Sequence, residues 1–159
     1  MTIGPFMSPD QDALLQAINA VCSEGLWMST RYFEPTPAWV HALETSECES
    51  HRLLVARDGG RIVGWCRAFP LSDDSRADVG IGLLPEHRGL GLGRMLLDQV
   101  LDWAANKELE QVVLSTRVDN ARAIHFFERH GFTTQGNRTD GWLDMACHLL
   151  PAGGYANGR

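Results

Sequence analysis

The sequence has little positive charge, no paired cysteine motif and no long hydrophobic run. Only 14 Lys and Arg residues stand against 20 Asp and Glu residues, which gives a formal net charge of -6. Because affinity for nucleic acid depends on clustered cationic side chains, this balance argues against a nucleic-acid partner and favours a cationic or amine-bearing one. The apolar runs fall far short of the ~20 residues that a membrane helix needs, so we expect no membrane partner.

The four cysteines, Cys22, Cys48, Cys66 and Cys147, are scattered, and none belongs to a Cys-x-x-Cys pair. The six histidines form no His-Glu-x-x-His motif or comparable ligand cluster. We therefore expect no metal, and we expect the cysteines to act as small buried hydrophobic side chains in a reducing compartment. The first ten residues contain neither a basic region nor an apolar signal segment, so a cytoplasmic location is expected.

The length of 159 residues suits one domain with one buried core. We expect that domain to span residues 1–150 and the glycine-rich residues 151–159 to form a flexible tail. A first helix is predicted to begin with Ser8 as its N-cap and to end at Gly25, and a second helix begins at Thr36-Pro37.

The centre of the chain has the pattern of a strand, a helix and a second strand. The strands are predicted at residues 78–84 and 112–116, and leucines at helical spacing lie between them. Such a unit is parallel and right-handed. Further strands are predicted at residues 52–57, 61–69, 132–135 and 142–149, and a short helix at residues 119–130. The hairpin signal Asp58-Gly59-Gly60 makes the first two antiparallel, so the sequence predicts one α/β domain with a mixed sheet.

Alternating glycines lie where the first of these central strands passes into the long helix, in the segment Gly89-Leu90-Gly91-Leu92-Gly93-Arg94. Glycines allow a close approach of the backbone to a ligand, and a helix N-terminus attracts anions, most plausibly a pyrophosphate here. No P-loop string is present, and Arg94 stands where a dinucleotide fingerprint needs its last glycine. The alternative is a flexible, glycine-containing turn that binds no ligand.

Three motifs occur together here in a characteristic order. Arg88-x-x-Gly91-x-Gly93 is followed by Asn120-x-x-Ala123 and then by Gly131-Phe132. In these motifs the chain resembles the GCN5-related N-acetyltransferases, the GNAT superfamily, over roughly residues 50–149. The resemblance implies a mixed, mostly antiparallel sheet with a central splayed pair of parallel strands and helices on both faces.

The resemblance also implies acetyl-CoA as co-substrate. Loop amides would hold its pyrophosphate, and the expected residues are Arg88, Gly89, Leu90, Gly91, Leu92, Gly93 and Arg94. Strand and helix residues would line its pantetheine arm, namely Ile81, Leu83, Leu84, Asn120, Ala123, Phe126 and Phe127. The backbone amide of Leu83 would polarise the thioester carbonyl.

In such a family the reaction is direct attack of a neutral amine on the thioester, which requires a proton acceptor. Asp78 matches the position where many relatives carry a glutamate, so it is either a base acting through water or a solvated strand-end aspartate. Phe127 stands where the family often has a tyrosine that protonates the leaving thiolate. The acid is therefore unassigned, with water, Ser115 or Thr116 as substitutes.

By the same resemblance, Trp27, Tyr32, Glu34 and Asp144 would contact the acceptor, which is a small amine or a protein amine. The alternative is that the aromatic side chains cap the core and that Asp144 points outward from its strand. A homodimer is also compatible with the sequence. The rival functions are a non-catalytic acyl-CoA sensor or scaffold and another nucleotide-binding α/β protein.

Overall fold

The computed structural model describes residues 1–26, 28, 32–45, 48–73, 75–137, 140–150 and 154–155. In chain order its elements, with η for a 3-10 helix, are β1 (Thr2–Pro5), η1 (Ser8–Asp10), α1 (Gln11–Ser23), α2 (Pro37–Glu44), β2 (Arg52–Asp58), β3 (Arg61–Pro70), β4 (Arg76–Leu83), η2 (Pro85–His87), α3 (Leu92–Asn106), β5 (Gln111–Arg117), α4 (Ala121–Glu128), β6 (Thr133–Asn137), β7 (Trp142–Leu150) and β8 (Gly154–Tyr155). Among the helices of this described part, none is both long and apolar enough to cross a membrane.

The strands form a mixed sheet in the order β1-β2-β3-β4-β5-β7-β6, and β8 pairs with β7. Strand pairs β1–β2, β2–β3, β5–β7 and β6–β7 are antiparallel, whereas β4–β5 is parallel. This confirms the predicted mixed α/β sheet with one parallel pair. The parallel ladder begins at Arg76–Gln111 and, in the described strands, ends at Asp78–Val113, although β4 itself continues to Leu83.

The chain divides into two compact units. The first unit comprises Met1–Phe69 and Gly80–Val100, and the second unit comprises Pro70–Val79 and Leu101–Arg159. The boundary passes through β4 and α3, so both elements contribute to both units. The single domain over residues 1–150 and the flexible tail stay predictions, and within that tail Gly154–Tyr155 form β8.

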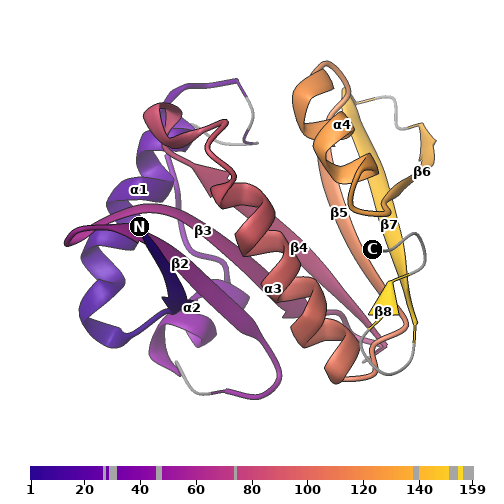
Figure 1. Cartoon of the computed structure of the whole chain (residues 1–159), viewed down its shortest axis with the longest axis horizontal. Helices are drawn as coiled ribbons and strands as arrows, with labels where there is room; N and C mark the ends of the chain where they lie inside the picture. Colours follow the sequence, from indigo (N-terminus) through magenta and orange to yellow (C-terminus); the bar gives the residue numbers. More distant parts are fainter. Residues whose placement is uncertain are drawn as a thin grey trace. The chain divides into compact units, whose positions relative to one another are not determined.

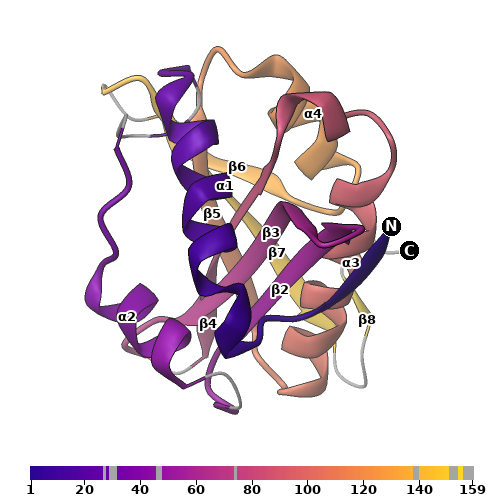
Figure 2. The same cartoon turned by 90° about the vertical axis from the view of Figure 1, so that its left-hand side faces the viewer.

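In the first unit, α1 and α2 lie on one face of β2 and β3, and the first part of α3 lies on the other face (Figures 1 and 2). The apolar stripe of α1 buries Leu14 and Ile18, four residues apart, as its periodicity predicts. Leu54 of β2 and Leu96 of α3 are buried as well. Each such side chain stabilises the fold by about 2 kcal/mol through removal of apolar surface from water.

The first helix begins later than the capping pattern predicts. Ser8 lies in the 3-10 turn η1, and the carboxylate of Asp10 accepts the Met7 N–H at 2.8 Å. Asp10 is the N-cap residue of α1 and also forms an ion pair with Arg57 at 2.5 Å. The expectation that Ser8 caps the helix was wrong, because Ser8 begins the 3-10 turn and α1 begins only at Gln11, after Asp10. Gly25 does follow the helix end, with φ of +69°.

Strand β1 was not predicted, because Gly4 and Pro5 are poor strand formers. It lies at the edge of the sheet, where Pro5 stands opposite Leu54 of β2. An edge strand has a side without a neighbour, so a residue without an N–H is tolerated there.

In the second unit, α4 lies against β5 and β7 (Figure 1). Phe127 of α4, Phe132 and Met145 of β7 are all buried. The aromatic rings of Phe127 and Phe132 lie 5.6 Å apart, which places this end of α4 in the core of the unit.

Candidate active site

The glycine-rich loop of the first unit joins η2 to α3 and contains two residues in the left-handed region. The φ angle is +78° at Gly89 and +87° at Gly91. Residues with a Cβ rarely adopt such angles, so the backbone itself requires glycine here. A Cβ built on Gly91 would have no atom within 4 Å, so this side of the loop is open.

The N–H groups from Gly89 to Arg94 donate to no acceptor in the part of the chain that the structure describes. The next N–H, from Met95, bonds the Gly91 carbonyl at 3.2 Å and starts the regular helix. A helix leaves its first N–H groups unpaired, and its dipole adds partial positive charge at the same end. The loop and the start of α3 therefore present a row of main-chain donors suited to a phosphate or pyrophosphate.

Arg88 anchors this loop through its side chain. Its guanidinium donates to both carboxylate oxygens of Glu24, at 3.0 and 2.6 Å, and its Nε donates to the Leu83 carbonyl at 3.1 Å. The two paired side chains are only 24% and 19% exposed, and bidentate pairs of this kind hold a defined geometry. The Arg88 N–H, expected among the anion donors, instead donates to the Pro85 carbonyl at 3.3 Å within the turn.

A second anchor holds η2. The buried His87 places its Nε2 3.1 Å from the Asp58 carboxylate in the β2–β3 hairpin. Neither this contact nor Glu24 was found in the sequence, because the partners are 29 and 64 residues apart. No local pattern marks either pair.

The end of β4 carries glycines because side chains of β3 cover it. A Cβ on Gly82 would overlap the buried indole ring of Trp65, and a Cβ on Gly80 would lie 2.8 Å from Arg67 Nε. Only glycine therefore leaves room for these side chains of the neighbouring strand.

Two backbone N–H groups that were expected to bind the pantetheine arm, those of Ile81 and Leu83, lie on the edge of β4 that faces away from β3. The Leu84 N–H donates to the Val63 carbonyl at 2.9 Å, so the Leu84 amide is engaged on the β3 side. Successive N–H groups of a strand point to opposite edges, and those of Leu83 and Ile81 therefore point away from β3. This direction is consistent with their expected role as ligands of an extended arm.

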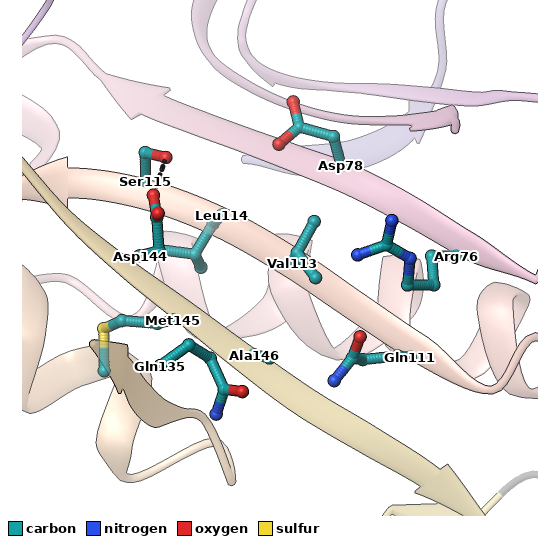
Figure 3. A pocket seen from close by; sticks show the side chains of 10 residues that line it. All are labelled: Arg76, Asp78, Gln111, Val113, Leu114, Ser115, Gln135, Asp144, Met145 and Ala146. Atoms are coloured by element: carbon teal, nitrogen blue, oxygen red, sulfur yellow. Dashed lines mark hydrogen bonds between the residues drawn. The ribbon is translucent and has the colours of Figure 1, made fainter. Parts of the chain in front are cut away.

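The second unit contains a pocket of about 280 Å³ on the face of β4, β5 and β7. Figure 3 shows Asp78 on β4, Ser115 on β5 and Asp144 on β7 around it. Gln111 and Gln135 also line it, and no sequence pattern pointed to them. The sequence named Asp78 and Asp144 separately, and strand pairing brings them to one pocket.

Carboxylates dominate the charge of this pocket. The Ser115 hydroxyl donates to Asp144 at 2.7 Å, while Thr116 is buried on the opposite side of β5. Among the described lining residues the one arginine is Arg76, which pairs with Asp73 at 2.7 Å, and this hydrogen bond lowers the pKa of Asp73 from its ordinary value. Because Arg76 is paired in this way, the pocket suits a cationic ligand.

Helix α4 begins at Ala121, and Asn120 is its N-cap residue. The Asn120 side-chain oxygen accepts the Ala123 N–H at 3.2 Å, which leaves the side-chain NH2 for a ligand. Phe126 is half-buried and its ring lies 4.6 Å from that of His130. Phe127 points into the core of the unit, between Phe126 and Phe132.

The expected acceptor residues are distributed over both units. Tyr32 and Glu34 are exposed side chains of the first unit, whereas Asp144 lines the pocket of the second. Trp27, which was expected beside them, lies outside the described residues. Trp39 is buried edge-on against Phe69 in the core, as its helical stripe predicts.

The model of the acetyltransferase (GNAT) family matches residues 15–132. The chain belongs to this family. The identification agrees with the mixed sheet, the parallel pair β4–β5 and the glycine loop at the start of α3.

Among individual GNAT proteins, a mycothiol acetyltransferase of Geodermatophilus obscurus is 39% identical over 86 residues, covering 50% of this chain and 28% of that protein. A putative ribosomal protein bS18-alanine N-acetyltransferase of Bacillus subtilis is 27% identical over 95 residues, covering 60% of this chain and 62% of that protein. The chain therefore spans less than two thirds of the length of these curated relatives.

The fold has a close match among solved GNAT structures. A putative acetyltransferase of Salmonella typhimurium, determined with its cofactor acetyl-CoA, superimposes with a TM-score of 0.78 over 94% of each chain at 22% identity. At this identity the likeness establishes the fold.

Proposed function

We propose that this GNAT protein is an acetyl-CoA-dependent N-acetyltransferase that acts on a primary amine. The observation that carries the proposal is the row of N–H groups from Gly89 to Arg94, which meets no acceptor in the described part of the chain. The open space beside Gly91 fits a bulky anion such as the pyrophosphate of acetyl-CoA.

Other residues would bind the pantetheine arm and orient the thioester. The outward N–H groups of Ile81 and Leu83 are suited to its amides, and the Asn120 NH2 supplies a further donor. The Leu83 N–H would stabilise negative charge on the thioester carbonyl. Acetyl-CoA supplies an acetyl group whose C–S bond breaks as the amine forms a new N–C bond.

Asp78 is proposed as the proton acceptor, through a water molecule. The attacking amine must be neutral, so one proton leaves it before attack and is taken up at the Asp78 carboxylate. Phe127 has no proton to donate, and its burial keeps it out of this role. A thiol with a pKa of ~8.5 leaves readily as thiolate, and the second proton, which the nitrogen loses as the amide forms, reaches the thiolate through water.

The acceptor is proposed to be cationic at neutral pH before it loses its proton. Asp78 and Asp144 both line the pocket of the second unit, and its arginine is paired with Asp73. A polyamine, an aminosugar or the amino terminus of a protein has this chemistry. The cytoplasmic location and the homodimer stay predictions.

Two measurements test the function. Calorimetry with CoA, ATP and NAD should show binding of CoA and not of ATP or NAD. Of the three, only CoA has both a pyrophosphate for the loop and a pantetheine arm for the β4 edge. Release of free thiol from acetyl-CoA should then depend on an added amine, in a panel of polyamines, aminosugars, amino acids and peptides. Binding of CoA without any amine-dependent thiol release would indicate an acyl-CoA sensor, and stronger binding of ATP or NAD would exclude the proposal.

A further inference from the structure

Three side chains with metal-binding atoms meet in the first unit, where α2 ends and β2 begins. His41 lies in the last turn of α2, Cys48 in the connection, and His51 directly before β2. One ligand atom from each lies within 4.8 Å of the others, and this is the single such group of three among the described residues. The group was not found from the sequence, because the three residues match none of the ligand spacings considered there, and the expected absence of a metal stays a prediction.

The distances within the group are close to those of a tetrahedral metal site. His41 Nε2 lies 3.3 Å from Cys48 Sγ. Two ligands at the usual Zn–S and Zn–N bond lengths would lie about 3.5 Å apart. The rings of His41 and His51 have centroids 5.4 Å apart and stand nearly perpendicular, at 79°. Two imidazoles bound to one tetrahedral zinc ion would have centroids about 5 Å apart.

His51 supplies a second, independent observation. Its side chain is only 5% exposed, and its Nδ1 has no hydrogen-bond partner in the described part of the chain. Edge-on packing against His41 and Phe69 holds the ring in place. Buried ring nitrogens are normally paired, and His51 Nδ1 lacks such a partner among the described residues, while one nitrogen of the same ring lies within 4.8 Å of the ligand atoms of Cys48 and His41.

We propose that His41, Cys48 and His51 bind a zinc ion, with water as the fourth ligand. One thiolate and two imidazoles are the ligand set that zinc prefers, whereas calcium and magnesium require oxygen. The ion joins the end of α2 to the start of β2 and so fixes this part of the first unit. Cys48 differs in this respect from Cys22, Cys66 and Cys147, which are buried as expected. The proposal does not depend on acetyl transfer.

The experiment uses the full chain without an affinity tag, stripped of metal and then titrated with zinc against a chromophoric chelator. Elemental analysis should find one zinc ion per chain. Cobalt(II) as a probe should produce the charge-transfer absorption of a thiolate ligand. Alkylation of Cys48, followed by mass spectrometry of its peptide, should slow at least tenfold when zinc is bound, because the bound thiolate is no longer a free nucleophile.

Two ligand variants and one control make the test specific. His41→Ala, at an exposed position, and Cys48→Ser should each weaken zinc binding on the order of 100-fold or more. His148→Ala, at another exposed histidine outside the group, should leave it unchanged. Equal zinc affinity in all three variants, or cobalt binding without thiolate absorption, would overturn the proposal.

Discussion

The glycine loop of the first unit and the pocket of the second unit are built from different parts of the polypeptide. The loop offers main-chain N–H groups from Gly89 to Arg94, whereas the pocket offers the side chains of Asp78, Ser115 and Asp144 from three strands. A main-chain site requires only that the backbone bends correctly, so glycines mark it in the sequence. A side-chain site depends on strand register, which local sequence shows poorly.

Among the variants that distinguish the loop from the pocket, Gly91→Val should cause the largest loss of CoA affinity. Valine is strained at φ +87° and places its side chain in the open space of the loop. Loss of two or more hydrogen bonds to a charged ligand should weaken CoA binding by on the order of 100-fold or more, measured by calorimetry.

Gly59→Val is the matched control. Gly59 also has a positive φ, +63°, and a Cβ there would also meet no atom within 4 Å, but it lies in the β2–β3 turn. Both variants should lose stability to a similar extent, and only Gly91→Val should lose CoA. Retained CoA affinity in Gly91→Val would show that the loop is not the anion site.

Asp78→Asn should lower kcat by about 100-fold at neutral pH, because the amine then loses its proton acceptor. The deficit should shrink as pH approaches ~10, where an alkylamine is deprotonated without help. Asp144→Asn, at the same pocket, should instead raise KM more than it lowers kcat. A pH–rate profile of Asp78→Asn that matches the original would remove Asp78 from the mechanism.

Glu24→Gln should have an intermediate effect, because it breaks the bidentate pair with Arg88 that anchors the loop. We expect the free energy of unfolding to fall by about 1.5 kcal/mol and CoA affinity to fall about tenfold. Glu86→Gln removes the Arg61–Glu86 pair, whose side chains are 64% and 52% exposed, and should leave both stability and CoA affinity nearly unchanged. Urea denaturation and calorimetry compare the two, and equal losses would contradict the anchoring role of Arg88.

Among the variants of the candidate site, Phe127→Tyr should have the smallest effect on turnover. The new hydroxyl would enter the aromatic cluster with Phe126 and Phe132, where Phe127 is 6% exposed, at a cost of about 1 kcal/mol. Phe126→Tyr, at a half-buried position, should cost less because its hydroxyl reaches water. Thermal unfolding and turnover are measured together, and a clear rise in turnover of Phe127→Tyr would show that this side chain reaches the reacting sulfur.

Local patterns predicted most of the fold. Thr36 caps α2 by accepting the Trp39 N–H, Asn120 caps α4, and Gly131 follows α4 with φ of +89°. The failures were not local, since the 3-10 turn at Ser8 and the edge strand β1 lie against the distant strand β2. In the candidate site, the loop, Asp78 and Asp144 were named from the sequence, but Glu24, which pairs with Arg88, was not.

The sequence by itself determined where the backbone turns, where helices begin and end, and which faces are apolar. Those features depend on the conformational preferences of a few neighbouring residues. Only the tertiary structure decided that Glu24 holds Arg88, that Ser115 bonds Asp144, and that His41, Cys48 and His51 meet. These contacts depend on where distant segments arrive after the core has packed, and no short stretch of sequence encodes that position.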